Sequence, residues 1–115
     1  MQIKYASQRV EKFFTDFSLM QRKLNPDWVR TIKKQLNAFK AADKFQDFLA
    51  LGLWHPEPLE GNGKGKNKKW SIHVTKNVRL VFEPNETGKV VTISEEIIIE
   101  GVVDYHGSNE SWYIP

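Results

Sequence analysis

The chain has 115 residues, of which 40% are hydrophobic and 27% charged, so we expect one domain spanning residues 1–115. It contains no cysteine, which excludes a disulfide framework, a thiolate zinc site and a cysteine nucleophile. No apolar run approaches the roughly 20 residues of a membrane span, and the N-terminus lacks the pattern of a secretory signal. These features predict a cytoplasmic protein with no membrane partner.

The net charge of +3 conceals an asymmetry between the two parts of the chain. Residues 1–82 carry 16 of the 17 Lys and Arg and seven of the 14 Asp and Glu, a balance of +9. Residues 83–115 carry one lysine and seven acids, a balance of −6. The split is typical of a basic surface that meets a polyanion, although lysines on helices also suit a merely solvated face.

The first half of the chain has mostly helical periodicity. Ile3 and Tyr5 alternate with polar residues and predict a short strand. From about Ser7 to Leu24, apolar residues recur every three or four positions, which predicts a helix. The cap Asn25-Pro26 opens a second helix, and a third helical piece is expected from about Asp43 to Leu51.

The second half of the chain is expected to form strands. Trp70 to Thr75 and Val78 to Phe82 alternate with a period of two, with a tight turn at Lys76-Asn77 between them. Two further apolar stretches follow, Val90 to Ile93 and Ile97 to Val103. The pattern predicts an α+β fold in which two to three N-terminal helices pack on a C-terminal antiparallel β-sheet.

A loop of glycine and lysine precedes the first of these strands. It runs from Gly61 to Lys69 and contains Lys64, Lys66, Lys68 and Lys69. Lysine supplies a mobile positive charge for phosphate, and glycine lets the backbone approach a ligand. The spacing is not that of a nucleotide-binding P-loop, and a solvated hairpin tip is the alternative interpretation.

Two further features place polar groups in the strands. Arg79 lies in an apolar strand, where it needs an anion if it is buried and none if it faces solvent. Asp104-Tyr105-His106 closes the last apolar stretch, and alternation predicts Asp104 and His106 on one face of the sheet with Tyr105 on the other.

The histidines raise the question of a metal. A zinc or manganese site is conceivable from His55, His73 and His106 with Asp104, but no pair of them has the ligand spacing of a helix or a zinc ribbon. We therefore expect no metal and no cofactor. The basic loop, Arg79 and the closing tripeptide together suit RNA strand cleavage, which needs a base, cations for the charge on phosphorus, and an acid.

The segment from about Leu51 to His106 resembles the HigB-type killer toxins of the RelE/ParE superfamily, which belong to type II toxin–antitoxin systems. The matching pieces are, in order, Leu59-Glu60-Gly61, the basic loop, Trp70-Ser71-Ile72-His73-Val74, Asn77-Val78-Arg79-Leu80-Val81-Phe82 and Asp104-Tyr105-His106. The resemblance implies a RelE-like fold and a metal-independent endoribonuclease that cleaves mRNA in the ribosomal A site. It also implies a helix-turn-helix antitoxin (HigA-like) that neutralises the toxin and carries it to operator DNA.

The resemblance also implies roles for individual residues. Arg79 would stabilise the phosphate in the transition state, and Asp104, Tyr105 and His106 would form the acid–base end of the site. The residues expected to contact RNA are Lys64, Lys66, Lys68, Lys69, His73 and His55.

The sequence departs from the family pattern in three places. His55 lies two residues further from Leu59 than in related toxins, His73 replaces the usual basic residue after Ser-Ile, and the connection from Gly88 to Asp104 is longer, with an extra β-excursion expected from Val90 to Glu96. Two other functions therefore stay open, a ParE-like gyrase poison and an inactive RNA-binding module. The apolar tail Trp112 to Ile114 is expected to pack on the core, with a contact to the antitoxin as the alternative.

Overall fold

The computed structural model describes residues 1–59, 69–85, 90–106 and 109–113, with the side chains of residues 106, 109 and 110 left out. The helical elements are α1 (Gln8–Thr15), α2 (Phe17–Lys23), α3 (Pro26–Ala41), α4 (Phe45–Leu49) and the 3₁₀ turn η1 (Val91–Ile93). The strands are β1 (Gln2–Tyr5), β2 (Glu57–Pro58), β3 (Trp70–His73), β4 (Val78–Pro84), β5 (Glu96–His106) and β6 (Asn109–Trp112). Within the described ranges, no helix combines the length and the apolar character that crossing a membrane requires.

The helices begin where the sequence places caps. Asn25 accepts a hydrogen bond from the N–H of Asp27 at 2.8 Å and opens α3, as predicted. The single helix expected from Ser7 to Leu24 is instead two, α1 and α2. Asp16 divides them because its carboxylate accepts the N–H of Leu19 and caps the second helix.

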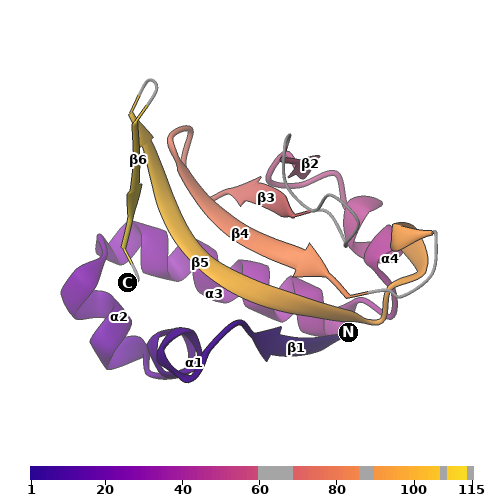
Figure 1. Cartoon of the computed structure of the whole chain (residues 1–115), viewed down its shortest axis with the longest axis horizontal. Helices are drawn as coiled ribbons and strands as arrows, with labels where there is room; N and C mark the ends of the chain where they lie inside the picture. Colours follow the sequence, from indigo (N-terminus) through magenta and orange to yellow (C-terminus); the bar gives the residue numbers. More distant parts are fainter. Residues whose placement is uncertain (60–68, 86–89, 107–108, 114–115) are drawn as a thin grey trace.

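The strands form one curved sheet in the order β1-β5-β4-β3-β2, with β6 paired to β5 (Figure 1). The α+β fold predicted from the sequence is confirmed, but the sheet is mixed. The pairs β2–β3, β3–β4, β4–β5 and β5–β6 are antiparallel, whereas β1 pairs with β5 in parallel. All four helices lie between β1 and β5 in the chain, so the crossover that a parallel pair needs is present.

The segment expected as an extra β-excursion is the turn η1. The N–H of Ser94 donates to the Val91 carbonyl oxygen at 3.0 Å, and the Ser94 carbonyl oxygen accepts the N–H of Phe45 at 2.9 Å. This insertion therefore joins the start of α4 to the start of β5, and it adds no strand.

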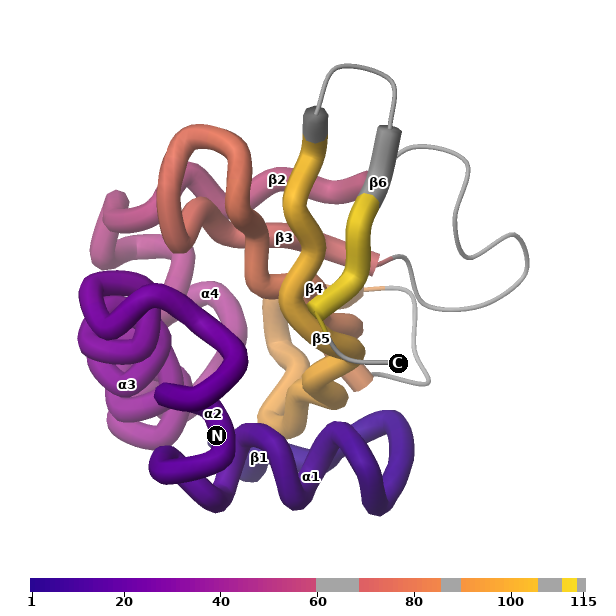
Figure 2. Tube along the Cα trace, turned by 90° about the vertical axis from the view of Figure 1, so that its left-hand side faces the viewer, coloured from indigo at the N-terminus to yellow at the C-terminus, as the bar shows by residue number. Residues whose placement is uncertain are grey.

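One hydrophobic core joins the helices to one face of the sheet. Phe39 of α3 stacks on Phe48 of α4 with ring centroids 4.0 Å apart and meets Phe82 of β4 edge-on at 4.9 Å. Ile72 and Leu80 are fully buried in the same core. Figure 2 shows α3 and α4 together on one side of the sheet strands. Residues that alternate with this core set therefore point to the opposite face.

Of the apolar tail Trp112 to Ile114, Tyr113 packs on the core as predicted, whereas Ile114 lies outside the described residues. Tyr113 donates its backbone N–H to the Val102 carbonyl oxygen, and its ring meets Trp28 of α3 edge-on with centroids 5.6 Å apart. Trp112 is 47% exposed, so the packing is carried by Tyr113.

Candidate functional site

Arg79 lies near the start of β4, on the sheet face opposite the helices. It pairs in register with His73 of β3 and Val103 of β5, and directly opposed residues share a face. Its side chain is only 19% exposed, and its Nη1 donates to Oε1 of Glu57 at 2.7 Å. Its Nε and Nη2 reach the carbonyl oxygen of Lys76 at 3.4 and 3.2 Å. The anion that a half-buried arginine requires is therefore supplied within the chain, by Glu57.

The closing tripeptide of β5 is divided between the two faces. The guanidinium carbon of Arg79 lies 5.6 Å from the centre of the Tyr105 ring, within the range of a cation–π contact. Asp104 pairs with Val78, a core residue, and its Oδ2 accepts the Tyr113 hydroxyl at 2.9 Å. The prediction that Asp104 and Tyr105 lie on opposite faces of the sheet is confirmed. The carboxylate of Asp104 thus lies on the helix side of the sheet. Burial raises the pKa of Tyr113, and the hydrogen bond from its hydroxyl to Asp104 raises it further.

His55 and His73 approach each other beside Glu57. Their ring centroids are 4.9 Å apart, and Nε2 of His55 lies 3.5 Å from Oε2 of Glu57. The backbone of His73 is held from two sides, because its N–H donates to the Trp54 carbonyl oxygen and its own carbonyl oxygen accepts Nε2 of Gln35. Trp54 and His55 have φ angles of 59° and 50°, in the left-handed region that such residues rarely adopt.

Burial lowers the pKa of His73, and the neighbouring charges of Arg79 and His55 lower it further, against the opposing effect of Glu57. The imidazole of His73 is therefore neutral at pH 7. A neutral imidazole can accept a proton, although the lowered pKa makes it a weaker base, and it contributes no charge to phosphate binding.

The basic loop contributes one described residue. Lys64, Lys66 and Lys68 lie outside the described residues, as does the side chain of His106, whose backbone ends β5 opposite Asn109. Lys69 is described, and its Nζ lies 3.8 Å from Oε1 of Glu100.

The two strands at the base of the basic loop are fixed by a backbone bond. The N–H of Leu59 donates to the carbonyl oxygen of Lys69 at 2.8 Å. Leu59 and Lys69, the described residues on either side of the loop, are therefore neighbours at the end of β2 and the start of β3. Burial raises the pKa of Glu100, and repulsion from Glu83 adds to this, while Lys69 acts in the opposite direction.

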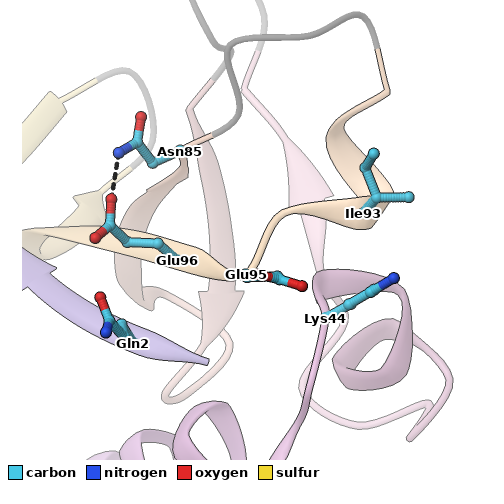
Figure 3. A pocket seen from close by; sticks show the side chains of 6 residues that line it. All are labelled: Gln2, Lys44, Asn85, Ile93, Glu95 and Glu96. Atoms are coloured by element: carbon cyan, nitrogen blue, oxygen red, sulfur yellow. Dashed lines mark hydrogen bonds between the residues drawn. The ribbon is translucent and has the colours of Figure 1, made fainter.

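A cavity of about 610 Å³ lies at the other end of β4 (Figure 3). Its lining residues are Gln2, Lys44, Asn85, Ile93, Glu95 and Glu96. In Figure 3 the Asn85 amide donates to the Glu96 carboxylate across one wall. Two glutamates repel phosphate, so this cavity does not suit a nucleic-acid backbone.

The structure brings together five side chains, which we call the Arg79 cluster: Arg79, Tyr105, His55, His73 and Glu57. Four were candidates from the sequence, whereas Glu57 was not. One signal could have found it. Glu57 is an acid two residues after His55, although the left-handed backbone of His55 means that strand alternation does not by itself bring the two side chains together.

Comparison of the chain with protein-family models, with curated proteins and with solved structures gives no match. Its function is therefore inferred from its residues and their geometry.

Proposed function

We propose that the protein is the toxin of a type II toxin–antitoxin system, a ribosome-dependent endoribonuclease of the HigB type. The observation that carries the proposal is the Arg79 cluster. A half-buried guanidinium lies on the sheet face opposite the helices, beside a phenol and two imidazoles, which are the groups that phosphodiester cleavage by an internal 2′-hydroxyl requires.

In the proposed reaction the 2′-hydroxyl oxygen attacks the adjacent phosphorus, and the bond to the 5′-oxygen breaks. Arg79 stabilises the negative charge that develops on the phosphate, and it exchanges Glu57 for the substrate as its anion. A neutral His73 suits the role of the base, and Tyr105 lies within reach of the same guanidinium to donate a hydrogen bond or a proton. No metal ion enters these steps.

Asp104 and His106 take a different place in this proposal. Asp104 binds Tyr113 on the helix side, so it acts on the site through the position of β5 and not by contact with the phosphate. The lysines of the basic loop and His55 would hold the RNA backbone, and His106 would supply a further proton donor. The proposed partners are mRNA on the ribosome and a helix-turn-helix antitoxin (HigA-like), through which alone the toxin would reach operator DNA. The site of action would be the cytoplasm.

The proposal is tested by brief induction of the protein in a bacterial host, followed by mapping of new 5′ ends on cellular mRNA. We expect new ends inside translated codons and growth arrest, because cleavage is coupled to translation. Arg79→Ala should abolish both, since about 2.7–4 kcal/mol of transition-state stabilisation is typically lost with one such donor.

Arg30→Ala is the matched control, because Arg30 is an exposed arginine of α3. It should cleave like the parent protein. Growth arrest without new 5′ ends would contradict the nuclease and favour a gyrase poison. RNA binding without cleavage or arrest would instead favour an inactive RNA-binding module.

A further inference from the structure

Three potential metal ligands converge at the edge of the sheet. One ligand atom each from His55, Glu57 and His73 lies within 4.8 Å of the other two. Two imidazoles and one carboxylate are a donor set that suits zinc and its neighbours among the divalent transition metals. We propose that these three residues bind such a metal ion, a site that the sequence spacing did not predict. The proposal does not rest on the proposed function, because a metal ion here would occupy the lone pair that His73 would need as a base, so the two roles of His73 are alternatives.

The orientation of His73 is the first observation behind this proposal. Its Nε2 atom is shielded from solvent and has no hydrogen-bond partner among the residues that the structure describes. A shielded ring nitrogen without a partner costs free energy, whereas a metal bond would use its lone pair. The bonds to Trp54 and Gln35 hold the backbone of this residue in place.

The carboxylate of Glu57 has one oxygen available for a metal. Arg79 binds Oε1, whereas Oε2 is the atom that faces His55. A carboxylate that ligates through one oxygen while the other accepts a hydrogen bond is the usual arrangement in metal sites. Arg79 would orient the Glu57 carboxylate through Oε1 without touching the metal ion. The negative charge of Glu57 would then lie between the guanidinium and the metal ion.

The distances require a small contraction. Ligand atoms around a tetrahedral zinc lie about 3.4 Å apart, so the widest separation in the cluster must close by more than 1 Å. His55 can supply this movement, because its side chain is 68% exposed and rotates without disturbing the core. Three protein ligands leave a fourth position for water.

The test uses the whole chain without a histidine tag, stripped with EDTA and titrated with ZnCl₂ by calorimetry in a buffer that does not bind zinc. We expect one zinc per chain, and a loss of affinity of at least about tenfold in His55→Ala and in Glu57→Gln. His55→Ala is the decisive variant, because the side chain is 68% exposed and its removal leaves the core intact. Cobalt in place of zinc should give the intense visible absorption of a tetrahedral site.

His106→Ala is the control, since it removes the third histidine of the chain and leaves the three ligands intact. It should bind zinc like the parent protein. Absence of zinc binding, an affinity unchanged in His55→Ala, or an equal loss in His106→Ala would each overturn the proposal. The melting temperature should rise with zinc in the parent protein and not in His55→Ala, which separates binding from misfolding.

Discussion

At the scale of single residues, the contact between Arg79 and Glu57 sets how strongly the site attracts a phosphate. The carboxylate is 39% exposed and competes with any incoming anion for the same guanidinium. We expect Glu57→Gln to bind a short single-stranded RNA about two- to fivefold more tightly, the range that a partly exposed ion pair supports. Filter binding at several salt concentrations measures the change.

A double-mutant cycle shows whether this gain passes through Arg79. In the Arg79→Ala background, Glu57→Gln should give almost no gain, because the partner of the carboxylate is gone. Glu11→Gln makes the same change in net charge on the exposed face of α1 and is the matched control. An equal gain in Glu11→Gln would attribute the effect to net charge alone.

The sequence predicted the candidate residues of β4 and β5 better than it predicted their partners. Alternation along a strand is a local property, so the opposite faces of Asp104 and Tyr105 could be inferred. Glu57 lies 22 positions before Arg79, and their contact depends on the register of β2 on β3 and of β3 on β4. Register is set by tertiary packing, which a single sequence does not display.

At the scale of elements, the predicted helices and strands mostly form, and the exceptions have local causes. Asp16 caps α2 in the middle of an unbroken apolar stripe, so hydrophobic periodicity alone joined two helices. The stretch from Val90 to Ile93 is apolar enough for a strand but forms a 3₁₀ turn, because Ser94 bonds back to Val91. The parallel pairing of β1 with β5 depends on a long crossover and left no local signal.

The last described residue, Tyr113, holds the end of the chain to β5. Tyr113→Phe keeps the ring against Trp28 and removes the hydroxyl that binds Asp104, so we expect a loss of about 1–2 kcal/mol in the free energy of unfolding. Denaturant titration measures this loss. An unchanged midpoint would show that the bond to Asp104 contributes nothing.

The same variant gives a pH signature. Burial raises the pKa of Tyr113 in the folded protein, so above about pH 10 the unfolded chain loses this proton first and stability falls as the pH rises. The fall should be shallower in Tyr113→Phe. It should not vanish, because burial also raises the pKa of Tyr5.

At the scale of the whole molecule, one core connects the helices that carry no candidate site to the strands that do. Phe39 contacts Phe48 and Phe82 and is fully buried, so it couples α3 and α4 to β4. We expect Phe39→Ala to cost about 3–5 kcal/mol, a large share of the stability of a domain this size. Because helices and sheet share this core, helix content by circular dichroism and tryptophan fluorescence should report one coincident transition in the parent protein and in Phe39→Ala.

The control is Leu53→Ala, at a position 48% exposed, which should change stability by less than about 0.5 kcal/mol. Two separated transitions, or a cost for Phe39→Ala no larger than that of Leu53→Ala, would mean that the sheet carrying Arg79 is stable without the helices behind it.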